Sequence, residues 1–108
     1  MANEGFFIVM AKVPKEKEAA FNTWYNEDHM PKALNRFPGV LSGRRYKIHD
    51  GGDGFNYMAL YEFESPDDVE ETMASDAIKG LIAEFDAAFP GTERKRITGE
   101  ELKTFILG

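Results

Sequence analysis

The sequence of 108 residues contains no cysteine, a single tryptophan and only two histidines. Without cysteine the chain cannot form disulfides, zinc–thiolate sites, iron–sulfur clusters or a thiol nucleophile. Long apolar runs are missing too, since the longest, residues 6–11, is far too short to cross a bilayer. No basic and apolar leader opens the chain. We therefore expect one small cytoplasmic domain, residues 1–108, that does not bind membranes.

A basic surface is also missing. The net charge is −6, and residues 55–108 carry twelve acidic side chains against five basic ones. Such a surface repels phosphate backbones, and no stripe of basic and aromatic residues offsets it. We expect no nucleic-acid partner.

The sequence offers little support for a bound cofactor or metal ion. The glycines near residue 52 join two predicted strands and do not open a helix, so they form no phosphate loop. A two-histidine metal site would need both His29 and His49, which a strand of about ten residues separates. Only two subunits together could join them. We expect no metal and no cofactor, because His29 as a haem ligand has no further signature beside it.

The hydropathy pattern predicts a β-α-β-β-α-β order. Turn and cap signals divide the chain into strands 6–13, 40–48 and 55–64, helices 15–30 and 66–89, and a final strand after residue 92. Pro31 is expected to break or kink the first helix at Met30, and Ser75 to start a second segment of the later helix. This order is that of the ferredoxin-like plait, an α+β fold with both helices on one face of an antiparallel sheet.

Two predicted strands are apolar on both faces. Residues 6–11 and 57–63 alternate large apolar side chains on either side, which one layer of helices cannot cover. A homodimer whose sheets pack face to face, enclosing a cavity, would cover the second face.

The end of the first helix carries the residues best suited to chemistry. Tyr25 and His29 are four residues apart, as are Trp24 and Asp28, so all four are expected on one side. His29 could act as a general acid or base with charge that changes near pH 6–7, Tyr25 as a proton donor and Asp28 as the group that orients His29. The alternative is a structural helix end in which His29 complements the dipole and the aromatic rings are core.

The second strand contributes an arginine pair. Arg44 and Arg45 point to opposite faces, so one of them faces away from solvent or toward a pocket. It could bind a carboxylate or an enolate-like oxygen, or form an ion pair at an interface.

The motif Trp-Tyr-Asn-Glu-Asp-His-Met-Pro at residues 24–31, followed by Phe-Pro-Gly-Val at 37–40 and Arg-Arg-Tyr at 44–46, resembles the dimeric α+β barrel superfamily, in particular its EthD-like branch. The resemblance implies a homodimer whose paired sheets enclose a mostly apolar cavity. Relatives include polyketide cyclases, muconolactone isomerases, small monooxygenases acting without a cofactor, lyases and haem-degrading enzymes. His29 occupies the position of the motif histidine.

We therefore expect a cofactor-independent lyase, isomerase or cyclase acting on a small aromatic or polyketide-like carbonyl compound. His29 would move a proton, Asp28 would orient it, and Tyr25 or Tyr57 would hydrogen-bond a developing oxyanion. Further substrate contacts are expected from Phe6, Trp24, Arg44, Tyr46, Tyr57 and Met58. The alternatives are a non-catalytic ligand-binding or stress-associated dimer, and a cofactor-independent monooxygenase.

Overall fold

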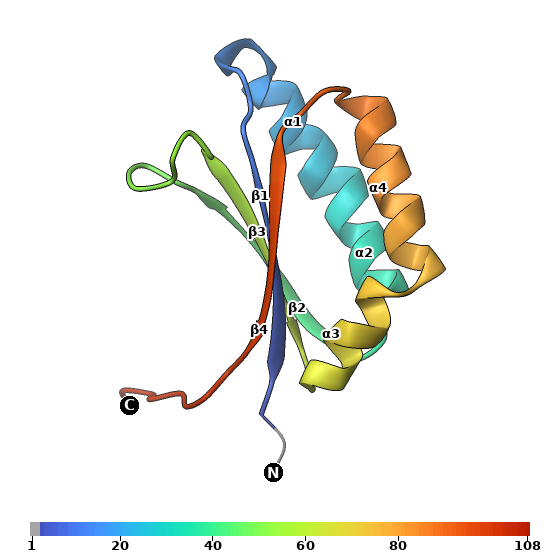
Figure 1. Cartoon of the computed structure of the whole chain (residues 1–108). Helices are drawn as coiled ribbons and strands as arrows, with labels where there is room; N and C mark the ends of the chain where they lie inside the picture. The colour runs from blue at the N-terminus through green and yellow to red at the C-terminus, as the bar shows by residue number, and fades with distance from the viewer. Residues whose placement is uncertain (1–2) are drawn as a thin grey trace.

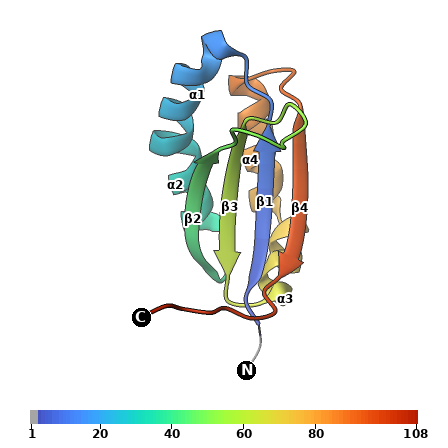
Figure 2. The same cartoon turned by 90° about the vertical axis from the view of Figure 1, so that its left-hand side faces the viewer.

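The computed structural model describes residues 3–108, which form a four-stranded antiparallel sheet with helices packed on one face (Figure 1). The strands are β1 (Gly5–Ala11), β2 (Val40–Lys47), β3 (Tyr57–Phe63) and β4 (Arg94–Glu100). They lie in the order β2-β3-β1-β4, which Figure 2 shows from the uncovered side. The predicted ferredoxin-like topology is confirmed.

The helical layer has two parts. The first runs without interruption through a 3₁₀ turn η1 (Lys15–Lys17), α1 (Glu18–Trp24), a π-helical turn η2 (Tyr25–His29) and α2 (Met30–Arg36). The second comprises α3 (Pro66–Met73) and α4 (Asp76–Ala88). Ser65 and Ser75 cap these helices, accepting hydrogen bonds from the backbone N–H groups of Asp68 and Ile78. Within residues 3–108, no helix is both long and apolar enough to span a membrane.

Pro31 does not break the first helix. The backbone N–H of Met30 donates to the carbonyl of Tyr25, five residues earlier, and the helix continues to Arg36. A proline inside an α-helix clashes with the carbonyl four residues before it, here that of Glu27. A wider turn just before the proline relieves this clash. Of the predicted break or kink at Met30, the break is not observed, because the chain widens in a π turn just before this residue and the helix continues.

The face of the sheet beneath the helices holds an aromatic core. Alternate residues of β1 and β3, including Phe7, Tyr61 and Phe63, point toward the helices and are buried. Phe21 of α1 packs with its ring 5.3–5.9 Å from four neighbouring aromatic rings, among them that of Phe85. These contacts fix the helices over the sheet.

The opposite face of the sheet, called here the open face, is also apolar. It carries Phe6, Ile8 and Met10 of β1, Met58 and Leu60 of β3, Tyr46 of β2 and Ile97 of β4. Tyr46 and Ile97 remain 41% and 37% exposed. In residues 3–108 no helix lies over this face (Figure 1). The predicted two-sided apolar sheet is therefore present.

Candidate functional site

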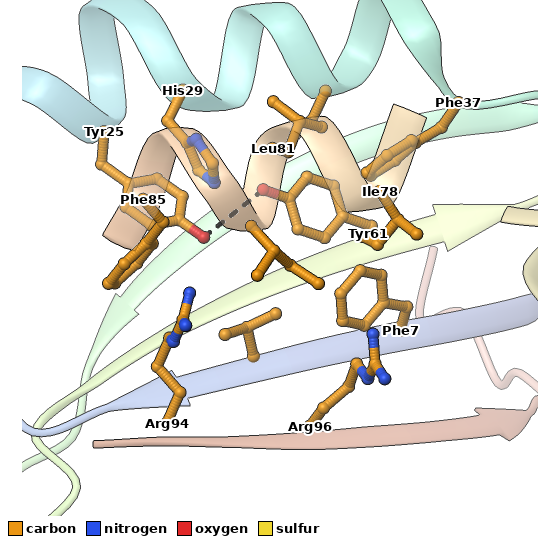
Figure 3. A pocket seen from close by; sticks show the side chains of 13 residues that line it. Phe7, Tyr25, His29, Phe37, Tyr61, Ile78, Leu81, Phe85, Arg94 and Arg96 are labelled. Atoms are coloured by element: carbon orange, nitrogen blue, oxygen red, sulfur yellow. Dashed lines mark hydrogen bonds between the residues drawn. The ribbon is translucent and has the colours of Figure 1, made fainter. Parts of the chain in front are cut away.

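A cavity of about 260 Å³ lies between the sheet and the helices. Aromatic and aliphatic side chains of β1 and α4 form much of its apolar wall, and its polar groups come from Tyr25, His29, Tyr61, Arg94 and Arg96 (Figure 3). The resemblance implied a cavity between paired sheets. This cavity instead lies within one chain, because its walls are the helix-facing side chains of the strands and the inner face of α4.

His29 reaches the cavity from the π turn. Its side chain is 7% exposed, and its ring stacks on Trp24 with centroids 4.4 Å apart. The edges of Tyr25 and Phe85 complete an aromatic enclosure, with ring centroids 4.9 and 5.8 Å from that of His29. Figure 3 shows the imidazole pointing toward the hydroxyl groups of Tyr25 and Tyr61. Within residues 3–108, its buried Nδ1 has no hydrogen-bond partner.

Burial controls the charge of this imidazole. Desolvation lowers the pKa of His29 from its ordinary 6.5 to about 4, and the negative charges of Glu84 and Asp28 oppose that shift only in part. The imidazole is therefore neutral at pH 7. The expected change of charge near pH 6–7 is wrong, because the aromatic enclosure replaces the water that would stabilise an imidazolium.

Two tyrosines present hydroxyl groups beside the imidazole. The hydroxyl oxygens of Tyr25 and Tyr61 lie 3.5 Å apart, and either can donate to the other. Burial raises the pKa of both phenols, so both stay protonated at neutral pH. Since only one hydroxyl hydrogen is used between them, the pair retains a hydrogen-bond donor for a ligand.

Three predicted residues on the helix side lie outside the cavity wall. Asp28 does not orient His29, because its carboxylate points outward and forms an ion pair with Lys32 at 3.1 Å. The hydroxyl of Tyr57 donates to a carboxylate oxygen of Glu18 at 2.9 Å, away from the cavity. Trp24 supports the back of the His29 ring and does not contribute to the wall.

The other four predicted substrate contacts lie on the open face. The register of the strands places Phe6, Met58, Arg44 and Tyr46 out of phase with the helix-facing positions. Because side chains alternate along a strand, the sheet separates these four residues from the cavity. Their assignment as walls of the same site as His29 is therefore wrong.

Arg45, not Arg44, is the arginine of β2 that faces the helices. Its guanidinium donates to the side-chain oxygens of Asn22 and Asn26, both at 2.9 Å, and lies 4.7 Å from the centre of the Tyr25 ring. Arg45 thus holds Tyr25 from behind and is not part of the cavity wall. Arg44 lies near Glu62 on the open face, at 3.5 Å.

Sequence reasoning does not identify Arg94 and Arg96 as cavity residues. A signal existed for the arginines, because residues two apart on one strand share a face. The sequence does not show which face of the final strand is buried, however, so it does not assign the arginines to the cavity. Among residues 3–108, no group of three His, Cys, Asp or Glu side chains is placed to hold a metal ion.

The fold is shared with solved structures of low sequence identity. An EthD family protein from Bacillus halodurans is 22% identical with a TM-score of 0.70, covering 92% of this chain and 99% of its own. SnoaB of Streptomyces nogalater, a cofactor-independent oxygenase, is 16% identical with a TM-score of 0.66, covering 95% and 97%. The hydroxynitrile lyase of Passiflora edulis is also 16% identical, with a TM-score of 0.66, covering 98% and 100%.

These neighbours confirm the expected likeness in fold to EthD-like proteins. No protein with a curated description matches the sequence. One family model does match, over residues 5–92, which include the π turn, all of α4 and most of the cavity wall. The chain therefore belongs to the family described as a domain of unknown function, DUF4286.

Proposed function

We propose that the cavity binds a small aromatic or polyketide-like carbonyl compound and that His29 transfers a proton to and from it. The observation that carries this proposal is the buried imidazole of His29, which lines the cavity and whose Nδ1 has no hydrogen-bond partner among residues 3–108. An unsatisfied buried polar atom costs about 1–3 kcal/mol, so a sequence selected for stability alone would place an apolar side chain there.

The proton transfer uses three groups of the cavity. The neutral imidazole of His29 accepts a proton from the carbon next to the carbonyl, the C–H electron pair forms a carbon–carbon double bond, and the π electron pair of the carbonyl moves onto its oxygen to give an enolate. The free hydroxyl hydrogen of the Tyr25–Tyr61 pair donates to that oxygen as negative charge develops on it. The imidazolium then returns its proton to another atom of the intermediate or to a leaving group.

The same first step suits more than one reaction class. Two proteins of this fold are described as a cofactor-independent oxygenase and a hydroxynitrile lyase. Removal of a proton can begin a reaction of either kind, as it can begin an isomerisation or a cyclisation. We therefore propose a cofactor-independent lyase, isomerase or cyclase, with an oxygenase as the alternative.

Non-catalytic binding is the second candidate function. The observation that favours it is again at His29, because neither Asp28 nor any other side chain of residues 3–108 hydrogen-bonds Nδ1 to orient the ring. A pKa of about 4 also makes the imidazole a weak base.

Deuterium exchange separates the two functions. Small aryl ketones with acidic hydrogens beside the carbonyl are incubated with the protein in D₂O, and exchange is followed by NMR. We expect the wild-type protein to accelerate exchange and His29→Phe to remove the acceleration. Binding of the ketones without accelerated exchange would favour the non-catalytic function.

We further propose that the chain forms a homodimer through the open face. This face exposes apolar side chains of all four strands, and face-to-face packing with a second copy would bury them. Because the cavity lies on the other side of the sheet, each subunit would keep its own site.

A further inference from the structure

The cavity has the opposite charge to the rest of the molecule. The chain has a net charge of −6, yet the residues that line the cavity in the described chain include two arginines and neither aspartate nor glutamate. Arg94 and Arg96 stand two residues apart on β4, so they share a side of the sheet about 7 Å apart. Figure 3 shows both side chains reaching from β4 toward the cavity.

One of the two arginines is paired with a carboxylate and the other is not. Arg94 forms an ion pair with Asp86, and its guanidinium carbon lies 4.2 Å from the centre of the Phe85 ring. For Arg96, no carboxylate oxygen of residues 3–108 lies within ion-pair distance. Arg96 therefore offers an uncompensated positive charge to whatever enters the cavity.

The position of Arg96 indicates the mouth of the cavity. Its side chain is exposed, as is part of Ile82 on α4, and both line the cavity. His29, Tyr25 and Tyr61 are buried. A ligand with one charged end would thus keep that end near Arg96 and place its apolar body toward the imidazole.

We propose that the ligand of this cavity is an aromatic or polyketide-like carboxylic acid whose carboxylate is bound by Arg96. This inference rests on the proposed function, since it names the class of compound on which His29 would act. A guanidinium matches a carboxylate with two parallel hydrogen bonds, and the apolar wall accepts the ring. Arg94, the other arginine of the cavity, is already paired with Asp86, so the unpaired guanidinium of Arg96 fixes the orientation of the ligand.

The test compares two probes of the same shape and different charge, trans-cinnamate and trans-cinnamamide. The chain has one tryptophan, Trp24, whose ring stacks on that of His29. Its single indole N–H signal in NMR therefore reports whether a probe occupies the cavity. Dissociation constants are measured for the wild type, Arg96→Gln and Lys95→Gln. Lys95 is the matched control, because it lies on the same strand but on the open face, and the substitution removes the same charge.

We expect the wild type to bind cinnamate about fivefold more tightly than cinnamamide, the upper range for an ion pair open to solvent. Arg96→Gln should remove this preference while keeping the affinity for cinnamamide, and Lys95→Gln should change neither. Equal binding of the two probes by the wild type would overturn the carboxylate proposal and leave the proposed function standing. Equal losses in both variants would also overturn it, because net charge alone would then explain the preference. If neither probe moves the Trp24 signal, both proposals are wrong.

Discussion

The neutral imidazole of His29 predicts a specific dependence of stability on pH. The folded-state pKa of about 4 lies below the ordinary 6.5 expected in the unfolded chain. Between these values the unfolded chain binds a proton at His29 that the folded chain does not bind. The free energy of unfolding therefore falls as the pH falls through this window, and the full contribution is present above pH 6.5.

The magnitude follows from the shift. Between pH 7 and pH 4.5, His29 should remove about 2 kcal/mol from the free energy of unfolding. Carboxylates also titrate in this range, and the pKa values of Glu18 and Glu84 are lowered by ion-paired and hydrogen-bonded partners. Since these groups are present in both proteins, the difference between the wild type and His29→Phe isolates the histidine. Phenylalanine keeps a ring against Trp24.

The assay is urea unfolding of both proteins at pH 7, 6, 5 and 4.5, followed by circular dichroism. We expect the wild type to lose about 2 kcal/mol more than His29→Phe over this range. A difference in the free energy of unfolding that is the same at every pH would reflect altered packing in His29→Phe and would not affect the test. Parallel curves would refute the reasoning, and a wild type relatively more stable at low pH would show a charged, paired imidazole. NMR gives an independent check of the pKa of His29, because the imidazole signals can be followed as the pH is changed. The chain has only two histidines, and the His29 signal is the one that His29→Phe removes.

Single substitutions in the core, on the open face and at a helix cap give three further predictions. Phe63→Ala, at a fully buried position, should lower the free energy of unfolding by about 3–5 kcal/mol in urea titrations, and a loss below about 1 kcal/mol would contradict its core position. Leu60→Asp should reduce the mass in sedimentation equilibrium from about twice 12.2 kDa to 12.2 kDa, whereas a monomeric wild type would contradict the proposed dimer. Ser75→Ala should cost about 1 kcal/mol in thermal unfolding, and no measurable change would show that the cap is unimportant.

The topology could be predicted because its signals are local. Turn glycines, alternating apolar residues and serine caps act over a few residues, so the strand predicted at 40–48 is observed as Val40–Lys47. The predicted second helix start at Ser75 is likewise observed, with its hydroxyl accepting from the Ile78 N–H. These features do not depend on which elements pack together.

The cavity could not be predicted in the same way, because it depends on packing between distant elements. The two i, i+4 pairs predict Asp28 on the same side of the helix as His29, but Asp28 instead forms an ion pair with Lys32, which also pairs with Glu84 of α4. The choice between Arg44 and Arg45 depended on strand phase, which the register with β3 decides. The two arginines of β4 face the cavity only because β4 lies beside β1 at the edge of the sheet.

Three departures from ordinary local structure lie around the cavity. The π turn before Pro31, the unpartnered Nδ1 of His29 and the long hydroxyl contact between Tyr25 and Tyr61 all lie at its wall or directly behind it. Elsewhere, helices α3 and α4 begin at serine caps, a register shift interrupts the β2–β3 pairing between Val40 and Ser42, and Asp53 in the turn after β2 has a φ of 54°. Natural sequences depart from local consistency mainly where function requires it. The π turn also explains the geometry, because it buries Tyr25 and His29 together while the helix continues past the proline. The imidazole of His29 and the hydroxyl groups of Tyr25 and Tyr61 line the cavity, and its mouth lies beside the exposed Arg96.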